Sequence, residues 1–248
     1  DTLPGASGYE WNKIEDELAI DHTVYTVDLL GCGRSDKSSI TYTNFVYVQM
    51  ISDFIKKIIG QKTDVIASGF SGSFVTMACH NEKELFNKIM LVNPPSLTQL
   101  KQMPNRKDRL LKAALEIPIF GTLVYHMIVS RDNINNLFIE KMYYNPFHVD
   151  NQMADAYYEA AHKGGYYTRF LYSSLAAKYI NINICHALKA LDNSIYIVEG
   201  ETEPNGKAVT DDYCASNPAI EVSVLKETKH LPHVEAPEAF LEQVKIFF

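Results

Sequence analysis

The sequence predicts an α/β fold, in which a mostly parallel sheet is flanked by helices and a helical segment is inserted between two strands. Short β-branched and apolar runs alternate with segments of helical periodicity, a pattern typical of crossover connections in parallel sheets. The stretch 97–190 breaks this alternation, because it holds helical patterns and no convincing strand. We therefore expect a core made of residues 1–96 and 191–248, with residues 97–190 as a helical cap insertion.

Five strands are expected, each a short apolar or β-branched run that ends near glycine, proline or asparagine. They cover residues 23–28, 64–68, 88–92, 194–198 and 220–225. Helical periodicity predicts core helices from the Ser7 cap to Leu18, then at 43–59, 74–80 and 236–247. The inserted segment is expected to hold helices at 110–117, 119–129, 134–143, 151–162 and 167–179.

Composition limits the function classes. The formal net charge is −7, and no run of lysine and arginine exists, which argues against a nucleic-acid partner. The four cysteines show neither paired nor dense spacing, so we expect reduced thiols in a cytoplasm, with no metal site and no cofactor.

The hydropathy of the chain indicates no membrane partner. No stretch of about 18 apolar residues is present. The opening residues DTLPGASGYEW have neither a basic region nor an apolar core, so no signal peptide is expected in this sequence. The oligomeric state is left open.

Ser71 is the candidate nucleophile. It lies in the string Gly69-Phe70-Ser71-Gly72-Ser73, between an apolar strand and a helix. Small residues on both sides allow a tight turn, which is expected to hold the serine in a strained conformation. The N–H of Gly72 is then placed at a helix start, where it can stabilise a developing oxyanion.

His230 is the candidate base. It follows the last expected strand in the string Thr228-Lys229-His230-Leu231-Pro232-His233 and precedes the last helix. A base on such a loop can reach over to a nucleophile on another loop. His233 is the competing candidate, while Glu235 is expected to order this loop by hydrogen bonding.

The acid that orients the histidine should follow the fourth strand, where the sequence reads Gly200-Glu201-Thr202-Glu203-Pro204. This gives the chain order serine, acid, histidine. Together, DLLGCGRSD, GFSGS, GETEP and KHLPHVEAPEAF resemble the α/β-hydrolase superfamily, and most closely its capped bacterial esterase-like serine hydrolases.

The resemblance assigns further roles. The family's G-x-x-D pattern places the catalytic acid at Glu203, completing a catalytic triad on a nucleophile elbow; Glu201, Asp211 and Asp212 stay as alternatives. It also implies that a loop containing Asp28, Gly31, Gly33 and Ser35 is architectural.

The second oxyanion donor is implied by the same resemblance. In the family it follows an H-G pair, and Asp1-Thr2-Leu3-Pro4-Gly5 is similar to the remainder of that loop, so Thr2 or Leu3 is expected to supply the N–H. We expect that the native chain has N-terminal strands absent from this sequence. Direct pairing of residues 23–28 with 64–68 would contradict that expectation.

The predicted activity is hydrolysis of a carboxylic ester of a small or medium apolar substrate through an acyl-enzyme. An aspartate-nucleophile dehalogenase or epoxide hydrolase is disfavoured by the serine at position 71. The same triad would also serve a C–C bond hydrolase, a thioesterase, a lactonase or a perhydrolase. A non-catalytic ligand-binding protein of the same fold remains the alternative from another class. The residues expected to contact substrate are aromatic: Phe70, Tyr143, Tyr144 and Tyr158.

Overall fold

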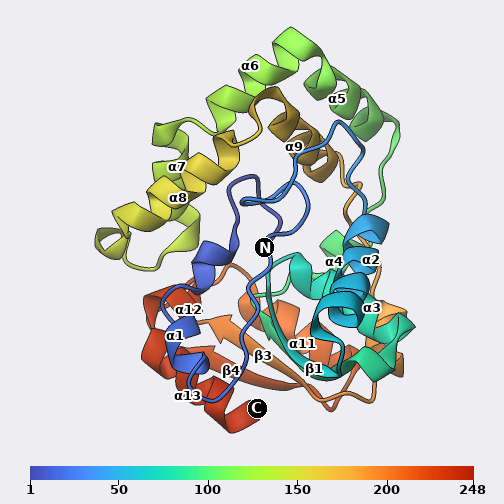
Figure 1. The fold of residues 1–248 in the computed structure, drawn as a ribbon, viewed down its shortest axis with the longest axis vertical. Helices are drawn as coiled ribbons and strands as arrows, with labels where there is room; N and C mark the ends of the chain where they lie inside the picture. The colour runs from blue at the N-terminus through green and yellow to red at the C-terminus, as the bar shows by residue number, and fades with distance from the viewer. The chain divides into compact units, whose positions relative to one another are not determined.

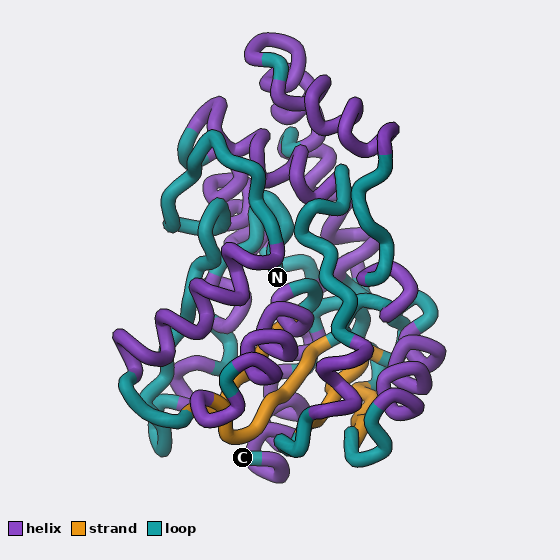
Figure 2. The backbone as a smooth tube through the Cα atoms, turned by 90° about the vertical axis from the view of Figure 1, so that its right-hand side faces the viewer, coloured by secondary structure: helices purple, strands orange, loops and turns teal.

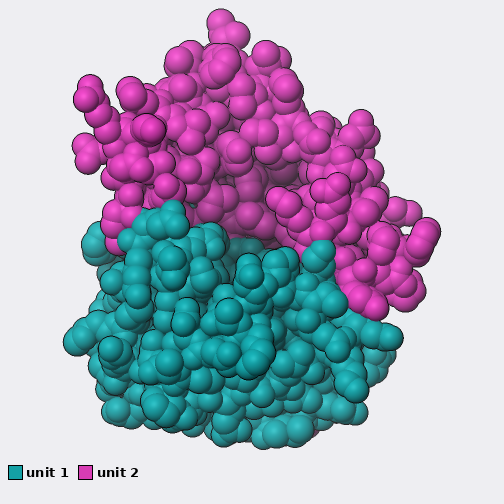
Figure 3. Space-filling model, turned by 180° about the vertical axis from the view of Figure 1, so that it is seen from behind, with its two compact units in different colours: residues 1, 44–102, 181–248 teal, residues 2–43, 103–180 magenta.

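The computed structural model describes all residues from Asp1 to Phe248, and the chain folds into two compact units (Figure 3). Unit 1 contains residues 1, 44–102 and 181–248, and unit 2 contains residues 2–43 and 103–180. Residues 2–43, which the sequence placed with the core, therefore group with the helical segment. The division into core and inserted cap stays a prediction.

Unit 1 contains a four-stranded sheet in which every neighbouring pair is parallel. The order is β1-β2-β3-β4, with bounds Thr63–Ser68, Phe86–Val92, Ile195–Gly200 and Glu221–Leu225. The register pairs Ser68 with Val92 and Val92 with Val198. Because the strands are parallel, the loops that follow them leave from one edge of the sheet. Four of the five expected strands are thereby confirmed.

Helices cover this sheet (Figure 1). Helix α3 packs against β1 and β2, and α2 packs against α3, while α13 contacts β3 and β4. The helices of unit 1 are α2 (Asn44–Phe54), α3 (Ser71–Asn81), α4 (Leu97–Leu100), α10 (Cys185–Ala190), α11 (Gly206–Ser216), α12 (Pro232–Glu235) and α13 (Pro237–Phe247). Every residue of β3 is buried, as expected for a strand with neighbours on both sides and helices on its faces.

Asn181 joins the two points at which the chain leaves unit 1 and returns to it. Its side-chain Nδ2 donates to the carbonyls of Gln99 and Gln102, at 2.8 and 2.9 Å. Its own carbonyl accepts a hydrogen bond of 2.7 Å from Asn44 Nδ2. The side chain is buried, so these bonds are protected from competing water.

Unit 2 contains helices and loops but no strand (Figure 2). Its α-helices are α1 (Glu15–Leu18), α5 (Arg106–Glu116), α6 (Pro118–Ile128), α7 (Arg131–Leu137), α8 (Asn151–His162) and α9 (Arg169–Ala176). Large side chains such as Tyr125, Phe138 and Leu171 are fully buried inside it. Tyr125 also donates from its hydroxyl to the Ala161 carbonyl at 2.7 Å.

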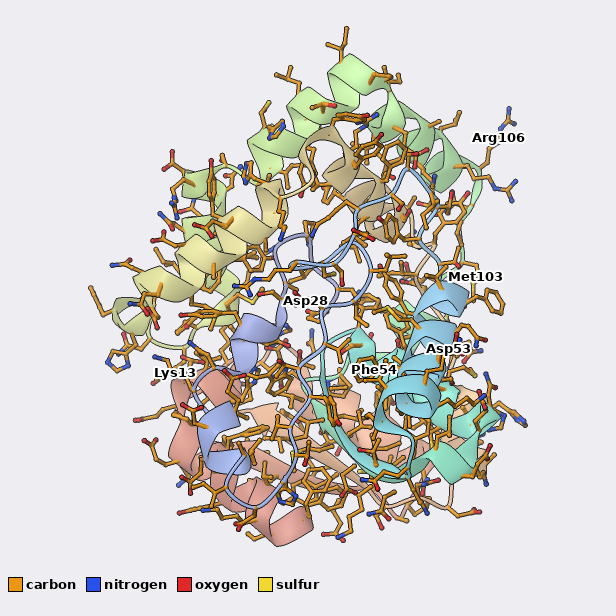
Figure 4. The ribbon with its side chains drawn as sticks, in the orientation of Figure 1. Lys13, Asp28, Asp53, Phe54, Met103 and Arg106 are labelled. Atoms are coloured by element: carbon orange, nitrogen blue, oxygen red, sulfur yellow. The ribbon has the colours of Figure 1, made fainter.

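Asp28 organises the loop that the sequence predicted to be architectural (Figure 4). Its two carboxylate oxygens accept from the backbone N–H groups of Gly8 and Arg34, both at 2.6 Å. Gly33 has φ +44°, and a Cβ there would overlap the Asp28 carboxylate. Ser35 donates to the Asp28 carbonyl at 2.7 Å. The loop is therefore fixed by one carboxylate and a glycine that leaves room for it.

Helices α5 and α6 meet at an angle of 95°. Asn105 and Asp108 form a capping box at the start of α5, and Pro118 begins α6. Gly121 permits the close approach, because a Cβ there would overlap the backbone of Leu115. Across the whole chain no single helix is long and apolar enough to cross a membrane, although this bent pair meets the criteria of length and composition.

Two expected elements differ from the structure. Residues 23–28 are not a strand and are not paired with 64–68, because unit 2 offers this segment no strand to pair with. The expected helix after Ser7 is instead a 3-10 turn, Gly8–Trp11, followed by the short α1, and the Ser7 side chain makes no cap hydrogen bond.

Candidate active site

A tight turn joins β1 to α3. Gly69 has φ +53°, a conformation that favours glycine, and its N–H donates to the Val92 carbonyl of the neighbouring strand at 3.0 Å. Helix α3 begins at Ser71, two residues later. The strand, turn and helix that the sequence predicted around Ser71 are therefore present.

The strain expected at Ser71 is absent, because Gly69 takes the positive φ and Ser71 already belongs to the helix. The Ser71 hydroxyl donates to the Ser68 carbonyl at 2.6 Å. The Gly72 N–H, expected to face an oxyanion, donates to the Gly69 carbonyl at 3.2 Å. Both groups thus complete the turn in this conformation.

His230 and Glu203 are brought together as the sequence predicted. His230 Nδ1 lies 3.2 Å from Glu203 Oε1, and both side chains are about one-fifth exposed, at 22% and 21%. A hydrogen bond donated by Nδ1 to Glu203 corresponds to the tautomer in which Nε2 is the basic nitrogen. This is the tautomer that a general base requires.

Asn93 fixes the loops that carry these two residues. It follows β2, and its side-chain Nδ2 donates to the carbonyls of Lys229 and His230 at 2.8 and 2.9 Å. Its Oδ1 accepts from the N–H of Gly200 at 3.0 Å. The residue is buried and has φ +43°. The sequence showed Asn93 only as the end of a strand, but an asparagine before two prolines marks a position that tolerates a left-handed conformation.

Asp1 lies between the turn and the histidine. Its Oδ1 accepts from the Phe70 N–H at 3.2 Å, and its Oδ2 lies 3.6 Å from His230 Nε2. The carboxylate also fills the space that a Cβ on Gly69 would need. The His230 ring and the turn before Ser71 therefore contact different oxygens of one carboxylate, which the sequence did not predict.

Glu199 is a second buried carboxyl group near Glu203. It is the last residue but one of β3 and contacts Gly206 at the start of α11, where a Cβ would overlap it. Burial raises the pKa of Glu199, and the Glu203 charge raises it further. Oε2 of each glutamate is buried without a hydrogen-bond partner. The acid side of the site is thus a pair of carboxyl groups.

The competing candidates lie elsewhere. His233 is fully buried in α12, with its ring 5.7 Å from that of Phe240. Glu201 accepts from the Glu227 N–H at 3.0 Å, and Asp211 pairs with Lys207. Asp212 is exposed on α11. As predicted, Glu235 orders the histidine loop, accepting from the Lys229 N–H at 2.7 Å.

The remaining predicted site residues, apart from Phe70, belong to unit 2. Thr2 is fully buried there, and the Leu3 carbonyl accepts from Ala6 N–H at 2.9 Å. Tyr143 is buried against Phe138, Tyr144 is exposed, and Tyr158 stacks under the Arg131 guanidinium. Phe70 is half-buried in unit 1, beside Ser71. Their roles toward substrate stay predictions.

A parallel sheet flanked by helices, with serine, acid and histidine loops following β1, β3 and β4, defines a protein of the α/β-hydrolase class. The model of the Alpha/beta hydrolase family matches residues 2–243. This chain belongs to that family.

Solved structures share the fold. An epoxide hydrolase superposes with a TM-score of 0.78 at 15% identity, covering 98% of this chain and 87% of that one. A meta-cleavage product hydrolase from Pseudomonas fluorescens gives 0.77 at 18%, covering 100% and 88%. An esterase from Exiguobacterium antarcticum gives 0.74 at 13%, covering 98% and 87%. At these identities the likeness shows the fold alone.

Sequence relatives match a shorter part of the chain. Uncharacterized proteins of Mycobacterium bovis and Mycobacterium tuberculosis are each 24% identical over 95 residues. The match covers 38% of this chain and 28% of each relative, so it spans less than a third of the length of these proteins.

Proposed function

We propose that the protein is a serine hydrolase, in which Ser71 is the nucleophile, His230 the base and Glu203 the orienting acid. The observation that carries the proposal is the Glu203–His230 hydrogen bond of 3.2 Å. When Nδ1 donates to Glu203, Nε2 is the basic nitrogen, and it lies on the side where Asp1 contacts both His230 and the turn before Ser71. Membership of the α/β-hydrolase family supports the same assignment.

Catalysis requires two local rearrangements. The Ser71 hydroxyl must rotate away from the Ser68 carbonyl, and His230 Nε2 must exchange the Asp1 carboxylate for the serine. His230 then takes the Ser71 proton as the serine oxygen attacks a carbonyl carbon, and the leaving group receives that proton. Water, deprotonated by His230, cleaves the acyl-enzyme and regenerates the serine.

The proposed substrate class is a carboxylic ester of a small or medium apolar acid. Aromatic side chains with a polar end suit such substrates. The esterase and the meta-cleavage product hydrolase named above share this fold, so ester and C–C cleavage are both compatible with it. A panel of p-nitrophenyl esters of increasing acyl length tests the ester assignment, and thioesters and lactones of matched size serve as competing substrates.

Labelling with a fluorophosphonate tests the nucleophile. We expect one covalent adduct on the full chain, lost in Ser71→Ala, with ester hydrolysis reduced by about 10⁴-fold or more. Ser216→Ala is the matched control, because that hydroxyl is exposed on α11 and bonds only the Asp212 carbonyl. An adduct that persists in folded Ser71→Ala overturns the assignment.

A non-catalytic binding protein is the second candidate, favoured by the Asp1 carboxylate on His230 Nε2. Asp1→Asn separates the two readings, since the amide removes the negative charge that lies 3.6 Å from His230 Nε2. A hydrolase is expected to react faster with the fluorophosphonate once this contact is weakened. If neither the parent chain nor Asp1→Asn reacts, the non-catalytic reading replaces the proposal.

A further inference from the structure

The corner between α5 and α6 exposes an unusual amount of apolar surface. Eight of the twenty large apolar side chains that the chain exposes lie between residues 103 and 127. We call six of these side chains, each at least half exposed, the apolar corner: Leu110, Ile117, Ile119, Phe120, Leu123 and Met127. Soluble monomers rarely gather exposed apolar side chains in this way without a binding role.

The exposed residues of α6 share one helix face. Ile119, Phe120, Leu123 and Met127 recur at the spacing of an apolar stripe, and the opposite face, with Gly121 and Tyr125, is buried. Ile119 is 86% exposed, the highest value among the exposed large apolar side chains of this helix. Helix α6 therefore has an exposed apolar stripe in addition to the face that is buried inside unit 2.

The exposed charges of α5 are of one sign. On α5, Arg106, Lys107 and Arg109 are exposed (Arg106 is labelled in Figure 4), whereas the helix's two acids are neutralised. Asp108 is buried and pairs with Lys178, and Glu116 pairs with Lys112. In a chain with net charge −7, this makes the first turn of α5, which precedes Leu110 of the apolar corner, locally cationic.

We propose that the apolar corner is a docking surface for an anionic lipid membrane. A helix with an apolar face and neighbouring cations lies in the membrane interface, with its apolar side chains among the acyl chains and its cations at the head groups. The eleven residues of α6 rise about 16 Å, roughly half the hydrocarbon thickness, which fits a helix lying in the plane. The 95° corner presents α6 and the end of α5 together.

Charge complementarity favours a lipid surface over a second copy of this chain. In a two-fold contact an identical surface meets itself, so a second copy offers the basic residues of α5 no free acidic partner from the same helix. Anionic head groups instead attract them, at about a fivefold gain in binding for each basic residue.

Co-sedimentation of the full chain with vesicles tests the proposal. We expect binding to phosphatidylcholine vesicles in which about one lipid in four is phosphatidylserine, and weaker binding to phosphatidylcholine alone. The double variant Ile119→Ser with Leu123→Ser should weaken binding by about tenfold or more. Phe147→Ser is the matched control, because Phe147 is 94% exposed in the same unit but lies outside the corner, and its binding should not change.

A charge variant gives an independent readout. Replacing Arg106, Lys107 and Arg109 together by glutamine should reduce binding to the anionic vesicles by about a hundredfold and abolish the preference over phosphatidylcholine. All variants alter exposed side chains, and unchanged melting curves verify their folding. Absence of vesicle binding overturns the proposal. So does a dimer in sedimentation velocity that Ile119→Ser with Leu123→Ser dissociates, because the corner would then bind a second copy.

Discussion

Replacing Asn93 by alanine should weaken unit 1 by about 4 kcal/mol. Three hydrogen bonds of this buried side chain, of 2.8–3.0 Å, would be lost, each worth about 1 kcal/mol net. Alanine at φ +43° adds about 1 kcal/mol of backbone strain. A loss of this size is a large part of the 5–15 kcal/mol of stability usual for a domain.

Asn93→Gly separates the two contributions. Glycine accepts the positive φ without strain but cannot make the three hydrogen bonds, so its cost should be about 3 kcal/mol. Urea unfolding followed by far-ultraviolet circular dichroism measures both variants. Asn87→Ala, on the same strand, is the control, because Asn87 makes an exposed hydrogen bond to Asp64, and its cost should stay near about 0.5 kcal/mol.

The same variants test whether Asn93 positions the histidine loop. Its Nδ2 holds the carbonyls of Lys229 and His230, so both variants should slow fluorophosphonate labelling even below the unfolding transition. The reasoning is refuted if Asn93→Ala unfolds within about 1 kcal/mol of the parent chain. Labelling at the parental rate in a folded variant would likewise show that this side chain does not position His230.

Three further predictions concern stability and thiol reactivity. Burial raises the pKa of Glu199, so the folded state keeps its proton at a pH where the unfolded chain, with its ordinary pKa of 4.5, has lost it. The stability that protonated Glu199 contributes to the folded state is fully present below its pKa in the unfolded chain. It is lost as the pH rises through its higher pKa in the folded state. Between about pH 5 and 8, Glu199→Gln should therefore lose less stability in urea than the parent, and parallel curves would contradict this. Burial raises the pKa of Cys32 and of Cys79 to about 12, so Ellman's reagent should modify them only after unfolding, and fast native modification of either would be contrary to the structure. Gly121→Ala should cost about 1–3 kcal/mol, because its Cβ would overlap the Leu115 backbone, and a rise in melting temperature would disprove the close contact.

Periodicity predicted the sheet well where strands are buried on both faces. The runs at 88–92 and 194–198 are central strands, and their apolar composition reflects burial on either side. Residues 23–28 have the same β-branched character but form no strand, because a strand requires a neighbour to pair with and composition cannot supply one. The short helix α10 was not predicted, because its six residues are too few to show helical periodicity.

The candidate site was predicted in part. From the order of the motifs along the chain, we predicted that His230 lies next to Glu203, and the structure brings these residues together although they are 27 positions apart. The contacts of Asp1 and Asn93 depend on where loops from different strands meet, which a linear pattern does not encode. The strain expected at Ser71 was wrong because Gly69 can take the positive φ at lower cost.

The Asn181 hydrogen bonds have a consequence for the modularity of the chain. Residues 103–180 leave unit 1 after Gln102 and return at Asn181, whose side chain binds the Gln102 carbonyl directly. A segment whose two ends meet can change in length or sequence without moving the strands on either side, because loop-closure entropy grows only slowly with length. Asn181 therefore marks a graft point, at which a different segment could be exchanged while β2 and β3 keep their register.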